Sequence, residues 1–431
     1  MKQNTLLLLR SFPLFILILI DAMAFSMIAP VLSSALVDPR TAVLMTGSPS
    51  RYNQLVYGFA IAVCPLIVLF MAPLLGRISD LAGRKKVLVI CCSGLVVGNF
   101  LIGAAIALRS VVALFIGRVI QGATSASQAM AQAAIVDASS PQDKSFNLSM
   151  TLLFSSFGFI MGPALGGYLS DSRISPLFGF SLPLYTVAAL SLANLFFLWL
   201  LYRDKAAALP GFSFSFQDLT QGIRDFFSAF RERSIRQISL SFLFMQMAWG
   251  CFFSFVSVFL IEKHGFTSSE VASFMSILGI GFCLSYGLIL PFIQKFFRTE
   301  HICFAGLLLT GLEILALVLP QGRGIMWLFP LPIAITVCFS YGTIITMFSD
   351  MAGSDRQGWV MGTTTSLIAM AWFASSFFAS FIEACSVFGN MVFTAVLFLA
   401  SLLFFRTVPY YGDQVLRVSR EMTGSRPEQV N

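Results

Sequence analysis

Twelve long apolar stretches constrain the fold of this chain more than any other feature of its sequence. Most have about 20 residues or more, and a helix of about 20 residues crosses a hydrocarbon core about 30 Å thick. They cover residues 12–36, 54–75, 87–108, 111–136, 147–169, 182–202, 238–262, 269–293, 302–320, 325–349, 359–384 and 390–408. Of the 431 residues, 57% are hydrophobic and 11% are charged. Since no soluble domain of this size buries so much apolar surface, we expect an all-α membrane protein with twelve transmembrane helices.

The connections between the stretches divide the chain into two halves. All are short except one, so we expect a six-helix half over 1–202, a cytoplasmic linker over 203–237, a second six-helix half over 238–409 and a cytoplasmic tail over 410–431. Apolar residues recur in the linker at helical spacing, and they are Leu219, Ile223, Phe226, Phe227 and Phe230. This pattern predicts an amphipathic helix on the inner membrane surface. A docking surface for a partner protein is the alternative.

The distribution of Lys and Arg predicts the orientation of the chain. Twenty of the 27 lie on the side of both termini, six lie on the other side, and Arg118 is within a stretch. Positive residues concentrate in cytoplasmic loops, so both termini are predicted to be cytoplasmic in a multi-pass protein of the plasma (bacterial inner) membrane. The net charge of +7 therefore reflects topology, and no nucleic-acid partner is expected.

The residues that bind metals and nucleotides are sparse and scattered. The eight cysteines form no C-x-x-C pair, and there are two histidines, His264 and His301. No G-x-x-x-x-G-K-[ST] motif for ATP is present. We therefore expect no cofactor, no metal site and no enzymatic activity.

A polar, basic segment runs from Gly76 to Lys86, between the second and third stretches. Gly76 and Gly83 would permit a tight reversal there. Its pattern G-x-x-x-D-x-x-G-R-K-K resembles the loop signature of the major facilitator superfamily of transporters. The resemblance implies a latch that joins the two halves and contains Gly76, Asp80, Gly83, Arg84 and Asp137. Asp350 and Arg356 would lie on its partner surface. Ordinary solvated loop charges are the alternative.

Two charged residues lie inside the apolar stretches of the first half. Asp21 is about 14 Å from one face and Arg118 about 10 Å from the other, at 1.5 Å per helical residue. Since an unpaired charge at such depth is costly, we expect the two to pair. The segment from Asp21 to Leu32 resembles the first helix of tetracycline-type proton antiporters, and the segment that starts at Arg118 resembles the superfamily's fourth-helix motif. These resemblances imply that both residues couple transport to protons. Structural hydrogen bonding alone is the alternative.

A polar stripe follows Arg118 and predicts one side of a cavity. Gln121, Ser125, Gln128 and Gln132 have the spacing of a single helix face, which must avoid lipid. In the second half, the polar and aromatic residues that could meet a ligand are Gln246, Trp249, Tyr286, Tyr341 and Trp372.

The fifth stretch contains a run of small residues, Gly158, Gly162, Pro163, Gly166 and Gly167. Glycines four apart form a flat face for close helix approach, and proline permits a bend. The run resembles the antiporter motif of drug and proton exchangers, which implies export. Two carboxyls fall outside these motifs. Glu313 is in a helix that the family fold places on the outside of the bundle, and Glu383 lies near an outer helix end, where we expect it to reach water.

Together the patterns predict a monomeric secondary transporter in the lipid bilayer. The resemblance implies alternating access between two halves, with protons and a small organic molecule as substrates, and favours export. An importer of a nutrient or of an iron-chelating small molecule is the first alternative. A membrane sensor that transports nothing is the second.

Overall fold

The computed structural model describes residues 2–41, 43–45, 47–139, 144–203, 220–232, 235–319, 322–352, 357–406 and 408. Within these ranges every regular element is a helix. The first half contains α1 Lys2–Leu36, α2 Ser50–Ala82, α3 Arg84–Ala107, α4 Val111–Ala123, α5 Ser127–Ala138, α6 Lys144–Tyr168 and α7 Leu182–Leu201. The linker contains α9 Gln221–Arg231. The second half contains α10 Arg236–His264, α11 Ser268–Leu284, η1 Ser285–Ile289, α12 Leu290–Ile293, α13 Thr299–Val318, η2 Arg323–Leu328, α14 Pro330–Ala352, α15 Gln357–Cys385 and α16 Val387–Arg406.

The prediction of twelve crossings is confirmed with one correction. Eleven segments in the described part of the chain are single helical spans long and apolar enough to cross a membrane. The fourth predicted span, 111–136, is instead built from α4 and α5. The Thr124 hydroxyl donates to the Ile120 carbonyl at 2.8 Å, and such local bonds compete with the helical ladder. On its other side, Thr124 packs directly on Gly94 of α3.

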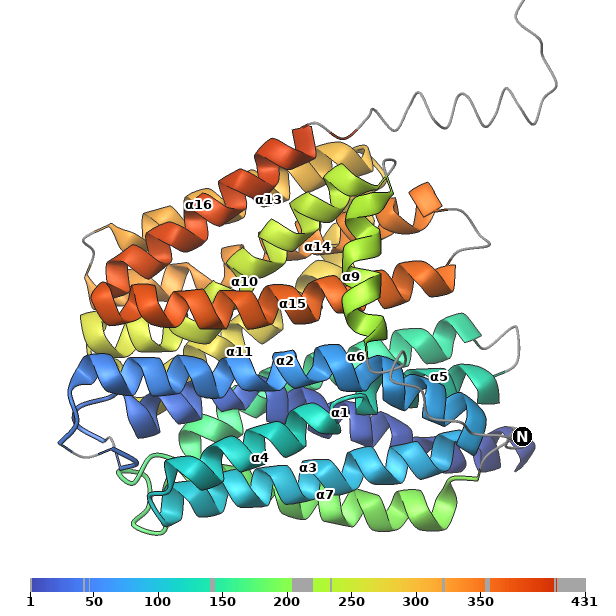
Figure 1. Cartoon of the computed structure of the whole chain (residues 1–431), viewed down its shortest axis with the longest axis horizontal. Helices are drawn as coiled ribbons and strands as arrows, with labels where there is room; N and C mark the ends of the chain where they lie inside the picture. Colours follow the sequence, from blue (N-terminus) through green and yellow to red (C-terminus); the bar gives the residue numbers. More distant parts are fainter. Residues whose placement is uncertain are drawn as a thin grey trace, which may run out of the picture.

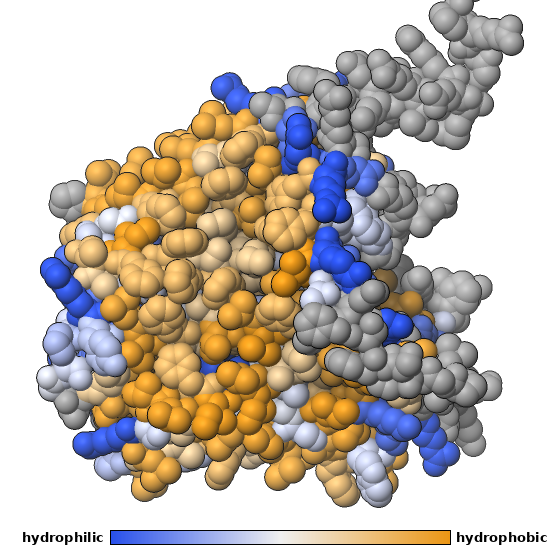
Figure 2. All heavy atoms as spheres, viewed as in Figure 1, coloured by the Kyte–Doolittle hydropathy of each residue, from blue (hydrophilic) through white to orange (hydrophobic). Residues whose placement is uncertain are grey.

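The two halves lie side by side, with their helices running roughly parallel across the molecule (Figure 1). α2 packs against α15, and α6 packs against α11, so these four helices form the junction of the halves. The visible outer face is predominantly apolar between polar residues at its two ends, as a surface in contact with lipid requires (Figure 2). We call the end that carries the α2–α3 turn and α9 the linker end, and the other the opposite end.

The segment between Gly76 and Lys86 is helical rather than a loop, which corrects the sequence prediction. α2 continues through Gly76 to Ala82, and α3 begins at Arg84. Gly83 alone reverses the chain, with a φ of 98° that favours glycine. No proline lies between Gly76 and Gly83 to stop the helix, so the polar character of the segment does not break it.

The linker helix predicted around Phe226 is present as α9, but it is docked on the bundle. α9 crosses α2 and α15 at the linker end (Figure 1). Phe226 and Phe230 pack against the core, whereas Phe227 is 55% exposed. Residues 204–219 and the tail 410–431 lie outside the described residues. The boundaries of the four predicted domains therefore stay predictions.

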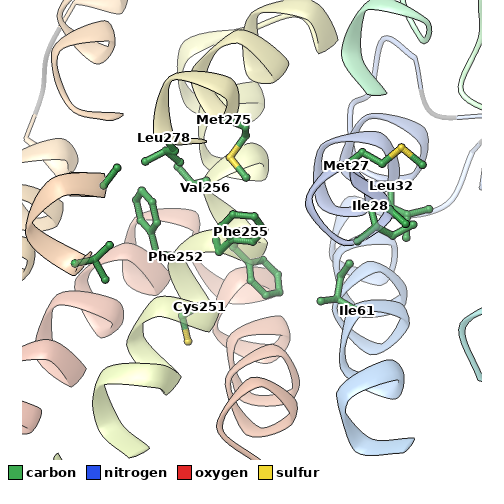
Figure 3. Close-up of a cluster of buried hydrophobic side chains, with 14 of the residues drawn as sticks. Met27, Ile28, Leu32, Ile61, Cys251, Phe252, Phe255, Val256, Met275 and Leu278 are labelled. Atoms are coloured by element: carbon green, nitrogen blue, oxygen red, sulfur yellow. The ribbon is translucent and has the colours of Figure 1, made fainter. Parts of the chain in front are cut away.

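The core at the junction of the halves is apolar. Met27, Ile28 and Ile61 of α1 and α2 face Phe255 and Met275 of α10 and α11 in the same buried cluster (Figure 3). Burial of such side chains contributes about 1.5–3 kcal/mol each in water, but in a bilayer the association of helices depends mainly on close packing.

Candidate functional site

Arg118 is buried in the first half, and every group that binds it among the described residues is uncharged. Its Nε donates to the Ala60 carbonyl at 2.8 Å, and its Nη2 donates to the Ile61 carbonyl at 3.3 Å. Its Nη1 donates to Gln121 Oε1 at 2.7 Å. Gln121 in turn donates to Asn99 Oδ1 at 3.1 Å, so a chain of hydrogen bonds fixes the guanidinium against α2.

A proline in α2 explains why one of the two backbone carbonyls, that of Ile61, is available for Arg118. Pro65 has no N–H, so the carbonyl of Ile61, four residues earlier, has no helical donor. In hydrocarbon such a freed group needs another partner. The guanidinium of Arg118 supplies it, and the multiple donors of Arg suit two adjacent carbonyls and an amide.

Asp21 does not pair with Arg118, which corrects the sequence prediction. No ion pair joins the two among the described residues, where both side chains are present. Asp21 instead lies beside Ser127 at the start of α5, and it is partly exposed. The depths of the two residues were compatible with a pair, but they could not show that carbonyls of α2, one of them freed by Pro65, would bind the guanidinium.

The predicted polar stripe is not a single face. Arg118 and Gln121 belong to α4, Gln128 and Gln132 belong to α5, and Ser125 lies in the break between them. Gln121 is 8% exposed and supports Arg118. Gln128 donates to Ser155 Oγ of α6 at 3.4 Å, so it joins neighbouring helices.

A cluster of aromatic rings crosses the junction of the halves. Phe25 of α1 is 5.1 Å from Trp372 of α15 and 6.0 Å from Phe253 of α10, centroid to centroid. Phe159 of α6 and Phe282 of α11 continue the cluster at 6.0 Å from one another. Trp249, at 5.9 Å from Phe253, completes it. Phe25 is nevertheless 44% exposed, so one side of its ring meets open space.

Phe25 and Asp21 share a face of α1, because residues four apart lie one turn, about 6 Å, from each other. The aromatic cluster and the partly exposed carboxyl therefore border the same region. Of the predicted cavity residues in the second half, Trp249 and Trp372 belong to this cluster.

The other three predicted cavity residues of the second half lie elsewhere. Tyr341 packs on Phe242, with centroids 6.0 Å apart, and Tyr286 of η1 lies against Gly342 of α14. Gln246 is 4% exposed within α10. Their part in a substrate site stays a prediction.

At the opposite end the halves are joined by polar contacts. Arg40 donates to the carbonyls of Gly265 and Phe266 at 3.2 and 2.8 Å, and Asp38 holds its guanidinium at 2.9 Å. Gln54 of α2 donates to Glu262 of α10 at 2.7 Å.

Deeper in the same contact, the Tyr57 hydroxyl of α2 donates to the Ser254 carbonyl of α10. On the other side of the junction, Ser268 donates to Ser34 Oγ at 3.0 Å, and Ser269 donates to Asp171 Oδ2 at 2.9 Å. The two halves are thus closed together at this end.

The predicted latch residues Arg84 and Asp137 lie together at the linker end, whereas the side chain of Asp80 lies outside what the structure describes. Arg84 at the start of α3 forms an ion pair with Asp137 of α5 at 3.1 Å, and it donates to Ser79 Oγ at 3.2 Å. These contacts stay within the first half. Asp350 is exposed in α14, and Arg356 lies outside the described residues. A latch between the halves therefore stays a prediction.

The glycines of α6 permit two different close approaches. A side chain at Gly158 or Gly162 would collide with the backbone of α1 at Leu19 or Met23. A side chain at Gly167 would collide with Ala272 of α11, in the other half. The predicted flat face is present, and it serves both the packing of the first half and the junction.

The two remaining carboxyls have different surroundings. Glu313 on α13 is half-buried and accepts a hydrogen bond from Thr336 of α14 at 2.7 Å. Glu383 does not reach water, contrary to the sequence prediction, because it is 1% exposed. The sequence shows that it is near a helix end, but not that α16 covers that end.

Sequence reasoning missed Phe25, Phe159, Phe253 and Phe282, as well as the pairing of Pro65 with Arg118. The abundance of Phe, 46 residues, hides the few that meet at the junction. One signal was available: Phe25 follows Asp21 by one helical turn. Pro65 is a proline inside an apolar stretch, but nothing in the sequence indicated which side chain would donate a hydrogen bond to the carbonyl that it frees.

Comparison with known proteins supports the fold and the resemblance. The chain is 26% identical to the class E tetracycline resistance protein of Escherichia coli over 356 residues, which cover 82% of each chain. Its structure is similar to that of the human organic anion transporter MFSD10, with a TM-score of 0.65, 19% identity and coverage of 92% of this chain and 99% of that one.

A D-xylose–proton symporter has a TM-score of 0.71 at 14% identity and covers 92% of this chain and 98% of its own. A family model described as Major Facilitator Superfamily matches residues 14–380, which is most of the sequence. The chain therefore belongs to the Major Facilitator Superfamily and is a multi-pass membrane transporter.

Proposed function

We propose that this protein exports a small organic molecule in exchange for protons. The observation that carries the proposal is the arrangement around Asp21. A partly exposed carboxyl, free of any described ion pair, lies one turn from an aromatic cluster to which both halves contribute. A carboxyl can exchange a proton with water in the cavity, whereas the aromatic rings offer an apolar surface to a ligand.

The arrangement of the junction supports alternating access. The opposite end is closed by polar bonds between the halves, and Phe25 precedes Ser34 in α1, so it lies on the linker side of that closure. The count of Lys and Arg supports a cytoplasmic linker end. In this arrangement Asp21 is loaded or unloaded from the cytoplasm, and the cavity faces inward.

The aromatic cluster also favours a class of substrate. A ligand that meets Phe25, Trp249 and Trp372 gains most if it is flat, partly apolar and able to stack. The relative named for tetracycline resistance fits such a ligand, and it favours export over import. Tetracycline is therefore the first probe to test, followed by other planar organic compounds.

Vesicles with an imposed pH gradient test the proposal. In inside-out vesicles with an acidic lumen, an exporter accumulates the probe as protons leave, and a dye inside reports the rise in lumenal pH. An importer instead gives uptake into right-side-out vesicles with an acidic exterior. No probe movement and no proton movement in either arrangement, across the whole compound panel, would favour the sensor.

A further inference from the structure

Glu383 and Asn390 form a buried pair at the opposite end of the second half. Glu383 is near the end of α15, Asn390 is in the first turn of α16, and they are 1% and 0% exposed. Asn390 Nδ2 donates to Glu383 Oε2 at 2.6 Å. The pair lies near Tyr57 of α2, at the contact between α2 and α10 that closes this end of the molecule.

Two oxygens of this pair have no donor. Glu383 Oε1 and Asn390 Oδ1 are both buried, and neither accepts a hydrogen bond. Buried acceptors without donors are costly, and an ionised carboxylate in this position would be costlier still. The charged groups nearest Glu383 are Glu262 and Lys263 of α10, and no ion pair joins Glu383 to either among the described residues.

The other titratable groups around Glu383 do not offer a positive charge. Tyr57 faces it from α2, and Cys251 faces it from α10. On α16 its partner is the neutral Asn390. Glu262 is already engaged by Gln54, at 2.7 Å. Neutralisation of Glu383 must therefore come from something bound at the pair itself.

We propose that Glu383 and Asn390 are a proton-binding site of the closed end. A proton on Glu383 Oε1 donates to Asn390 Oδ1 while Asn390 Nδ2 donates to Glu383 Oε2. A carboxylic acid and a primary amide then form a ring of two hydrogen bonds, which satisfies both oxygens. A divalent cation fits less well, because it takes six or more oxygen ligands and the pair offers two.

The site has a consequence for the opening of this end, and that consequence rests on the alternating access of the proposed function. With the proton bound, the pair is neutral and can remain buried. Without it, Glu383 carries a charge that is stabilised by water. Loss of the proton therefore favours separation of the halves at the opposite end, and a rise in pH on that side should open it.

Infrared difference spectroscopy of the purified, folded protein tests whether the proton is present. We expect a carboxylic acid carbonyl band that shifts in heavy water, is lost in Glu383→Gln and moves to higher frequency in Asn390→Leu, where the ring is broken. Glu313→Gln is the matched control and should keep the band. A spectrum in which Glu383→Gln removes no such band would overturn the site.

A distance measurement tests the effect on the closed end. Arg51→Cys at the start of α2 and the exposed native Cys385 at the end of α15 can carry spin labels, in a protein whose half-buried Cys64 and Cys283 are replaced by Ala. In the wild-type background the separation should widen as pH rises. In Glu383→Gln it should stay short at every pH, since the glutamine amide can form the same ring.

Two outcomes would contradict the proposal. One is a separation that responds to pH equally with and without Glu383→Gln. The other is a separation that responds to sodium and not to pH. The readouts also distinguish this site from the proposed function. A pH-dependent separation without proton-driven flux would support the site and contradict proton coupling. Proton-driven flux with a pH-independent separation would support proton coupling and contradict the site.

Discussion

Asp21 and Arg118 carry opposite charges in the same half of the molecule, yet their surroundings differ in kind. Arg118 is 6% exposed, and carbonyls of α2 and the Gln121 amide bind its guanidinium. Asp21 is partly exposed and faces Ser127. One charge is fixed in place by neutral partners, and the other is left accessible.

The difference separates two roles that a shared ion pair would combine. The guanidinium of Arg118 joins α4 to α2 through hydrogen bonds to two carbonyls. A carboxyl can change its charge, and Asp21 is partly exposed. Under the proposed function, proton coupling would belong to Asp21, and Arg118 would have a supporting role.

The largest expected effect follows from Asp21→Asn. An amide has nearly the same size and polarity as the carboxyl, so folding should be preserved, but it cannot carry an exchangeable charge. Flux driven by a pH gradient should fall to the level of vesicles without protein. Flux of substrate down its own gradient should persist. Unaltered coupling in the folded variant would remove Asp21 from the mechanism and make Glu313 the next carboxyl to test.

A second effect, on stability as well as on transport, is expected from Arg118→Ala. The change leaves the carbonyl of Ile61 without a donor and removes hydrogen bonds to a charged group, at a cost of about 2 kcal/mol in the free energy of unfolding. Arg118→Lys should recover part of it, because an ammonium can reach only some of these acceptors. Thermal unfolding in detergent measures both, with the exposed Arg109→Ala as the control.

A double-mutant cycle tests directly whether Asp21 and Arg118 interact. If Asp21 and Arg118 act separately, their effects on unfolding should add to within about 0.5 kcal/mol. A coupling well above that value would restore the ion pair that the sequence predicts and the structure lacks.

The apolar pattern of the sequence was sufficient for the fold. Length and hydrophobicity identify a span wherever the helix is continuous, as in α7, since a bilayer leaves the backbone few alternatives. The break after Ala123 was not predictable in this way. It depends on the Thr124 hydroxyl and on the close contact with Gly94, which is 30 positions away in the sequence.

The candidate site was predictable in its residues more than in its partners. Asp21 and Arg118 are conspicuous because a charge in an apolar stretch is rare. Which group binds each charged side chain depends on tertiary packing. The carbonyl that Pro65 frees lies on a different helix from Arg118. Phe25 could be recognised as a site residue only from its contacts with Phe253 and Trp372 of the other half.

A moderate effect is expected from Pro65→Ala, which sharpens the account of Arg118. Alanine restores the N–H, so the Ile61 carbonyl regains a helical donor that competes with the guanidinium. The protein should remain as stable as the wild type, while transport falls several-fold because Arg118 is less firmly held. Pro13→Ala in α1, far from Arg118 in the sequence, is the control. An undiminished rate would show that the freed Ile61 carbonyl does not matter to the site.

A second proline in α2 provides the smallest test of the same principle. Pro73 leaves the carbonyl of Leu69 without a helical donor, and there the neighbour is Gly222 of α9 instead of a charged side chain. A side chain at position 222 would collide with that carbonyl, so Gly222→Val should lift α9 from α2.

The expected result is faster proteolysis of the linker with little change in transport, because α9 lies away from Asp21 and the aromatic cluster. Gln221→Ala, at an exposed position one residue earlier, should leave the cleavage rate unchanged. If Gly222→Val abolishes flux in folded protein, the freed carbonyl at Leu69 belongs to the transport machinery as much as the one at Ile61. The contrast between a functional and a structural use of the two prolines would then be lost.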